Sequence, residues 1–208
     1  MRIDSVSPNP DRAGRYLVRC GSENLKLYRQ TIEDFALYPG RELGEEEEQR
    51  LRESIGAMSA KMRAVRIVSS TNVSRRDLEH RLVRKGEDPA QAKQAVEWME
   101  DLNLVDDGET ARIVVRQCIH KGYGLARAKQ ALYEKQIPKD LWEEALEDYP
   151  DQSEHILKFL RSKLPDPTDE RQKRRTIDAL LRRGHSYGAI RRCLEVLGTE
   201  TEEYGEDW

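Results

Sequence analysis

The chain has 208 residues, of which 36% are charged and 37% are hydrophobic, and its formal net charge is −3. A net charge this small excludes a surface that is basic throughout, although local basic patches remain compatible with it. The hydrophobic share provides only a thin core for this length. We therefore expect either one stack of helical repeats, in which each unit buries one face on its neighbours, or two small domains.

The start of the chain and its cysteines indicate the cell compartment. Residues 1–4 carry no apolar run, and no stretch is apolar enough to cross a membrane, so we expect a soluble, cytoplasmic protein. Cys20, Cys118 and Cys193 are widely spaced and odd in number, which does not fit a disulfide framework. Cys118 and Cys193 lie on helical core stripes and are expected to be buried as small hydrophobic residues.

Residues 1–43 differ from the rest of the chain. Alternating residues predict short strands over 3–6, 16–20 and 24–28, with a tight turn between the last two. A capping-box pattern beginning at Thr31 predicts a short helix that ends before Pro39. This extension could be a cap over the open end of a helical stack or a small β appendage that binds a partner, and we favour the cap.

One long helix is predicted over residues 45–69. Four glutamates, 45 to 48, suit its first turn, where the helix dipole favours negative charge. Its apolar stripe is expected to be core: Leu51, Ile55, Met58, Met62 and Val65.

The segment from Leu82 to Gly86 recurs twice, as Leu132 to Gln136 and as Leu180 to Gly184. Each copy ends a helix and precedes a new helix start, and the spacing of about 45–50 residues is typical of helical repeats. Gly86 and Gly184 should adopt the left-handed conformation that ends a helix, and Gln136 stands at the equivalent position. The pattern predicts a mainly α protein: three tandem three-helix repeats forming an elongated curved array, with a small N-terminal β appendage.

The predicted boundaries of the three repeats follow from these helix starts and ends. Repeat 1 spans residues 45–103, with later helices at 74–85 and 89–102, started by Ser74 and Asp88. Repeat 2 spans 107–149, with helices at 107–121, 124–136 and 138–148, and its first helix starts at Asp106 or Asp107. Repeat 3 spans 151–197, with helices at 151–164, 169–183 and 186–197, and residues 198–208 form an acidic tail expected to be disordered. Val83 and Leu181 are placed on the apolar faces.

These residues carry a resemblance to a known family. Leu102 to Asp107, Val115-Arg116, Lys121 to Gly124 with Arg127 and Leu132, and Leu180 to Gly184 with Ser186-Tyr187 and Ile190 together resemble the signature of the regulatory protein RecX family. The sequence departs from that signature at Thr110, Leu125, Gln136, Ala179 and His185. The departures concern local packing.

The resemblance implies a modulator of the recombinase RecA. RecX proteins are similar to one another as tandem three-helix repeats that lie in the groove of the RecA–DNA filament. There they inhibit filament extension, ATP hydrolysis and strand exchange in recombination, DNA repair and the SOS response. The implied partner is the RecA filament on DNA. We further expect a monomer, no membrane partner, and at most a weak direct contact with single- or double-stranded DNA.

Basic residues gather in two places, at the end of the first repeat and throughout the third. A basic stripe can contact DNA phosphates or an acidic protein groove, and the sequence does not separate the two. The candidate partner or nucleic-acid contacts are Arg75, Arg76, Arg84, Lys85, Lys121, Arg127, Arg171, Lys173, Arg174, Arg175, Arg182, Arg183, Arg191 and Arg192, and Arg81 belongs to the first cluster.

No pattern indicates an enzyme, a cofactor or a metal. The histidines, 80, 120, 155 and 185, are scattered and show no metal-ligand spacing, and Gly122-Tyr123-Gly124 lacks the lysine of a phosphate-binding loop. Three hypotheses remain: a RecA regulator, a helical-repeat scaffold for another protein, and a direct DNA-binding protein. Tyr123 and Tyr187, each near arginines, are the candidate stacking platforms for single-stranded DNA.

Overall fold

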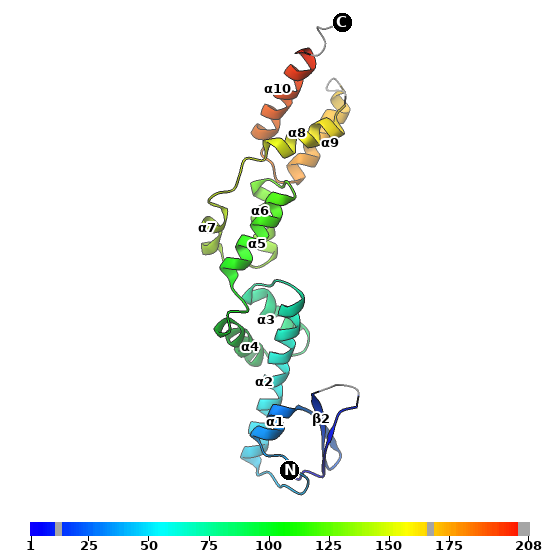
Figure 1. Cartoon of the computed structure of the whole chain (residues 1–208), viewed down its shortest axis with the longest axis vertical. Coiled ribbons are helices and arrows are strands. Elements are labelled where there is room, and N and C mark those ends of the chain that lie inside the picture. Colours follow the sequence, from blue (N-terminus) through cyan, green and yellow to red (C-terminus); the bar gives the residue numbers. More distant parts are fainter. Residues whose placement is uncertain (11–13, 166–168, 204–208) are drawn as a thin grey trace. The chain divides into compact units, whose positions relative to one another are not determined.

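The computed structural model describes residues 1–10, 14–165 and 169–203, with side chains described as far as residue 198. It divides into two compact units, Met1–Val105 and Asp106–Trp208, and each is described by itself. The described chain is mainly helical with one small antiparallel sheet near the N-terminus, as predicted (Figure 1). The boundary between the units falls between predicted repeats 1 and 2. The elongated, curved array stays a prediction.

The sheet of the first unit has the order β1-β2-β3, with strands Ser5–Pro8, Arg15–Cys20 and Glu23–Tyr28. The last two strands agree with the prediction, but the first begins later. Ile3, predicted to start that strand, is fully buried, and its backbone instead pairs with the segment before the long helix, donating to the Arg41 carbonyl at 2.8 Å. Pairing with that segment displaces the start of β1.

The first helix, α1 (Arg29–Asp34), begins directly after β3 and not at Thr31 as predicted. Tyr28 precedes it without a side-chain cap, and Thr31 is buried inside the helix. The capping-box pattern was therefore wrong here, because the strand passes into the helix before the pattern begins.

The long helix α2 (Glu45–Ser70) joins two parts of the first unit. Near its start, Leu51 and Ile55 pack in one core with Ile3, Val18 and Leu27. The rest of α2 packs with α3 (Arg75–Arg84) and α4 (Pro89–Asp101) in a second core. The extension therefore packs on the first part of α2, and its role as a cap or as a partner-binding appendage stays a prediction.

The predicted methionine stripe of α2 is not its most buried line. Ala60, Ala64 and Ile67 are buried, whereas Met58 and Met62 are only half-buried. Small residues let α4 approach closely, and a side chain at Gly56 would meet the Gln91 amide at 2.2 Å. Close helix packing selects alanine and glycine, which the apolar periodicity alone did not reveal.

Three of the predicted helix caps are confirmed. Ser74 accepts a hydrogen bond from the Asp77 amide at 3.1 Å, Asp88 from the amides of the first turn of α4, and Asp106 from Glu109 at 3.0 Å. Each cap satisfies an amide that would otherwise lack a partner.

The second unit contains two groups of helices. The first group is α5 (Asp107–His120), α6 (Leu125–Glu134), the 3₁₀ turn η1 (Lys139–Leu141) and α7 (Trp142–Leu146). The helix predicted over 138–148 is thus a 3₁₀ turn and a short α-helix. The second group is α8 (Ser153–Lys163), α9 (Glu170–Arg182) and α10 (Tyr187–Glu203). The last helix enters the stretch predicted to be a disordered tail, and residues 204–208 lie outside the described residues.

The repeated helix ends are confirmed in detail. Gly86, Gln136 and Gly184 have φ of 90°, 57° and 86°. In each copy the next residue donates its amide to the carbonyl of a buried leucine, for example Glu87 to Leu82 at 3.2 Å. This pattern is the Schellman motif. The residue after each of these leucines faces solvent, so the prediction that Val83 and Leu181 join the core was wrong: they are 38% and 42% exposed.

Candidate functional site

The described part of the chain offers no group of three or more His, Cys, Asp or Glu side chains that could hold a metal ion. None of the described helices combines the length and apolar character that a membrane span requires. The three thiols are free and buried, and burial raises the pKa of each. The candidate functional surfaces are therefore the two places where basic side chains gather.

In the second unit, α9 presents a basic face. Arg171, Arg174, Arg175 and Arg182 are exposed, and their spacing places them on one side of the helix, which also carries the exposed acid Asp178. The opposite side is held in the core by Thr176 and Leu180. Among the described residues, none of the four arginines has a carboxylate partner. We call these four side chains the α9 basic face.

Other members of the predicted third-repeat cluster have structural partners. Lys173 pairs with Glu170 at 3.1 Å, and Arg191 with Glu195 at 2.9 Å. The Arg183 guanidinium lies over the Phe159 ring, 4.6 Å from its centroid. Arg192 is exposed on α10. The predicted cluster is thus divided among the α9 basic face, the exposed Arg192, two cations paired within their own helices (Lys173 and Arg191), and Arg183, which packs on α8.

Two further candidates lie in the first helical group of the second unit. Arg127 donates to both carboxylate oxygens of Glu134, at 2.8 and 3.4 Å, and this hydrogen bonding lowers the pKa of Glu134. Lys121 is exposed just after α5. Arg127 is therefore a partnered surface residue, whereas Lys121 presents its charge to solvent.

The first-repeat cluster is divided by the helix that carries it. Arg75 and Arg76 lie at the start of α3, where Arg75 pairs with Glu100 at 2.7 Å and Arg76 is exposed. Arg84 and Lys85 lie at the other end of α3. The structure therefore does not bring these four residues together.

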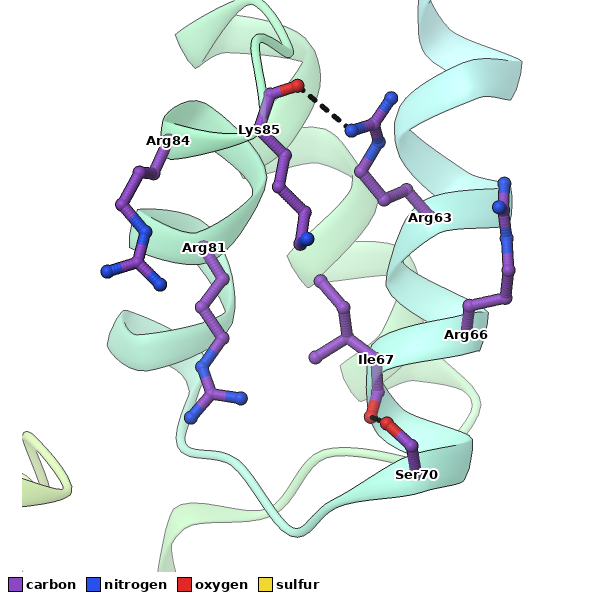
Figure 2. A pocket seen from close by; sticks show the side chains of 7 residues that line it. All are labelled: Arg63, Arg66, Ile67, Ser70, Arg81, Arg84 and Lys85. Carbon is purple, nitrogen blue, oxygen red and sulfur yellow. Dashed lines mark hydrogen bonds between the residues drawn. The ribbon is translucent and has the colours of Figure 1, made fainter.

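Arg84 and Lys85 instead border a groove between α2 and α3 (Figure 2). The groove has a volume of about 650 Å³. Five of its seven lining residues are cations contributed by the two helices, and we call it the α2–α3 groove. The lining residues are Arg63, Arg66, Ile67, Ser70, Arg81, Arg84 and Lys85.

Two acids hold two of these cations in place. The Arg63 Nε lies 2.6 Å from a carboxylate oxygen of Glu87, a buried residue, and its Nη1 donates to the Lys85 carbonyl at 2.9 Å. The Arg81 Nε donates to Asp77 at 2.8 Å. The described residues provide Arg66, Arg84 and Lys85 with no carboxylate partner. Three cations of the groove therefore remain uncompensated.

The sequence analysis found the α3 side of this groove but missed the α2 side. Arg63 and Arg66 flank the buried line of Ala60, Ala64 and Ile67, so a correct assignment of that line would have placed them at its edge. Their convergence with Arg84 and Lys85 depends on the packing of α2 against α3, which no local pattern encodes.

Comparisons with known proteins agree with this organisation. A model described as RecX, second three-helix domain, matches residues 106–146. The regulatory protein RecX of Syntrophotalea carbinolica is 32% identical over 135 residues, covering 61% of this chain and 88% of that protein. The RecX of Halorhodospira halophila is 28% identical over 152 residues, covering 71% and 94%.

A solved structure shows the same fold. The crystal structure of a regulatory protein RecX matches 92% of this chain and 98% of its own, with a TM-score of 0.67 and 19% identity. The fold and its basic surfaces define a class of protein built from groups of packed helices with exposed cationic faces. The chain belongs to the RecX family of regulatory proteins.

Proposed function

We propose that this protein regulates RecA, by binding in the groove of the RecA–DNA filament and inhibiting filament extension, ATP hydrolysis and strand exchange. The observation that carries the proposal is membership of the RecX family, supported by a relative that aligns over most of its length. The function needs no reaction chemistry in the regulator. It needs surfaces that recognise a filament.

The α9 basic face supplies one such surface. Its four arginines are exposed, and the described residues leave them without carboxylate partners, so binding need not first break an ion pair. Arginine forks pair bidentately with carboxylate or phosphate. We infer that this face contacts an acidic surface of the filament in preference to bare DNA, because the formal net charge of −3 gives the chain no overall attraction to DNA.

The test of the proposal is DNA-dependent ATP hydrolysis by RecA, with and without this protein. We expect the hydrolysis rate to fall when the protein is present below equimolar amounts. An unchanged rate both below and at equality would contradict RecA regulation and leave the scaffold hypothesis.

A charge variant then tests the α9 basic face. Arg174→Gln, Arg175→Gln and Arg182→Gln together should weaken inhibition, while the melting temperature stays near that of the wild type because exposed charges contribute little to folding. The control carries Lys26→Gln, Arg50→Gln and Lys93→Gln, which remove the same charge from exposed positions of the first unit. Equal inhibition by both variants would mean that the α9 basic face faces solvent and does not contact the filament. If the α9 variant inhibits RecA as the wild type does but binds bare DNA more weakly, the protein is a direct DNA-binding protein.

A further inference from the structure

The α2–α3 groove differs from an ordinary solvated basic surface in its construction. Its cations come from two helices and line a space bordered by Ile67 and Ser70. Lys85 and Arg63 lie between the helices, whereas Arg84 and Arg66 lie along the two sides (Figure 2). The groove concentrates positive charge where repulsion between the side chains opposes it.

The two arginines with carboxylate partners, Arg63 and Arg81, keep free N–H donors. Asp77 engages only the Nε of Arg81, so both Nη groups of Arg81 keep free N–H donors. Glu87, which also accepts a hydrogen bond from the Ser59 hydroxyl at 3.1 Å, and the Lys85 carbonyl fix Arg63 through its Nε and Nη1. The remaining Nη2 of Arg63 is available. Fixed guanidinium groups with free donors are prepared to receive an oxyanion.

The helix dipole explains the positions of only some of the cations in the groove. Arg81 and Arg84 lie in the last turn of α3, where the exposed carbonyls favour cations. The last turn of α2 contains no basic residue, so Arg63 and Arg66 do not owe their positions to that effect. Arg63 is instead held by Glu87 and the Lys85 carbonyl, and the Nε of Arg66 donates to the Met62 carbonyl at 3.2 Å, which leaves the charge of Arg66 without a carboxylate partner among the described residues.

The chemistry of the lining selects the class of ligand. Ile67 is the only apolar residue that lines the groove and is just 8% exposed, whereas protein partners are anchored mainly by buried apolar or aromatic side chains. The surplus charge is shared by Arg66, Arg84 and Lys85, so a ligand with several negative groups fits better than a single anion. Phosphate groups linked in a chain provide that spacing of charge and match arginine forks.

We propose that the α2–α3 groove binds consecutive phosphate groups of a linear polyanion, supplied either by a nucleic-acid strand or by a free polyphosphate such as a nucleoside triphosphate. Arg66, Arg84 and Lys85 provide the uncompensated charge, and Arg63 and Arg81 provide oriented donors. The inference goes beyond RecA regulation and is tested without RecA, so either proposal can fail while the other stands.

The test uses the full chain and two probes, sodium tripolyphosphate and a fluorescent thymidine oligonucleotide. The groove variant carries Arg66→Gln, Arg84→Gln and Lys85→Gln, which spare the two anchored arginines. The matched control is the Lys26, Arg50 and Lys93 to Gln variant. Thermal melting at low salt measures tripolyphosphate binding, and fluorescence anisotropy measures oligonucleotide binding across a salt series.

We expect at least one probe to bind the wild type and the control alike, and the groove variant to bind roughly tenfold or more weakly. For the oligonucleotide, loss of three phosphate contacts should reduce the salt slope by about 2. Binding of the oligonucleotide without competition by tripolyphosphate identifies a nucleic-acid strand as the source. Stabilisation by tripolyphosphate that displaces the oligonucleotide identifies free polyphosphate.

Three outcomes would overturn the proposal: neither probe binds the wild type, both variants weaken binding equally, or polyglutamate binds the groove more tightly than either phosphate probe. The last would identify an acidic protein as the partner. If the groove variant melts early, the Arg66→Lys and Arg84→Lys variant keeps the charge and removes only the forked donors. That variant should bind more weakly than the wild type, and unchanged binding there would also count against the proposal.

Discussion

At the scale of single residues, the helix-ending glycines show how identical sequence signals acquire different surroundings. Gly86 and Gly184 both hold positive φ, at 90° and 86°. A Cβ on Gly86 would meet nothing within 4 Å, whereas one on Gly184 would lie 2.2 Å from the Arg127 backbone nitrogen. The backbone strain is shared, but of the two only Gly184 lies against a neighbouring element, the first turn of α6.

We therefore expect Gly86→Ala to destabilise the protein by about 1 kcal/mol, through backbone strain alone. Gly184→Ala should destabilise it further, by about 1–3 kcal/mol more, because the clash is with backbone. Chemical denaturation of the two variants measures the difference. Equal losses would mean that the first turn of α6 and the loop at Gly184 can move apart without a cost in stability.

Gln136 provides the complementary control, because it holds φ of 57° where its equivalents are glycine. Its side-chain oxygen is also buried with no hydrogen-bond partner in the described structure. Gln136→Gly should leave the unfolding free energy unchanged or raise it by up to about 1 kcal/mol. A clear loss of stability would indicate that the side chain makes a favourable contact.

At the scale of elements, the second unit is joined by loops that meet backbone to backbone. The Gly124 amide donates to the Arg183 carbonyl at 2.9 Å, and a Cβ on Gly124 would lie 2.1 Å from the Gly184 carbonyl oxygen. His185, 7% exposed, donates through Nε2 to the Gly122 carbonyl at 3.1 Å. This joint connects the group of α5 and α6 with the group of α8 to α10.

The joint should weaken in mild acid. Burial lowers the pKa of His185 below its ordinary value of 6.5, opposed by the hydrogen bond to Gly122 and assisted by the charges of Arg183 and His155. The pKa of His185 is lower in the folded state than in the unfolded chain. The neutral ring therefore stabilises the fold above pH 6.5, and this stabilisation is lost as the pH falls through the pKa of the folded state.

The wild-type melting temperature should therefore fall between about pH 7.5 and about pH 5.5 more steeply than that of His185→Gln, which keeps a donor but does not titrate. His80→Gln, at an exposed position of the first unit, is the control and should follow the wild type. Parallel curves for all three proteins would rule out His185 as the titrating group.

At the scale of the whole molecule, each unit has cores of its own. The cores of the first unit are drawn from residues up to Val105, and those of the second from Ala111 onward. None of these four described cores mixes residues of the two units. Folding of one unit therefore does not need apolar contacts from the other.

We expect fragments 1–105 and 106–208, expressed separately, each to give a helical circular dichroism spectrum and a cooperative melt. The first fragment should also show the β contribution of its sheet. A fragment that is unfolded alone but folds when its counterpart is added would mean that the units depend on each other.

The sequence by itself determined the features that depend on a few neighbouring residues. Ser74, Asp88 and Asp106 were predicted as helix caps, and Gly86 and Gly184 as left-handed helix ends, because such signals act through the residue's own backbone and the next turn. The mainly helical class, the β extension and the RecX resemblance followed from the same local signals and their repetition.

Only the tertiary structure decided which charges are free and which surfaces they share. The cluster predicted over Arg75 to Lys85 is divided between the two ends of α3, and Arg63 and Arg66 join its C-terminal end across the α2–α3 groove. In the second unit Glu134 and Glu195 neutralise Arg127 and Arg191, while Arg174 and its neighbours on α9 stay exposed. Helix packing brings together residues that are distant in sequence, and an arginine's charge is available to a partner only where no carboxylate of the same fold lies within reach.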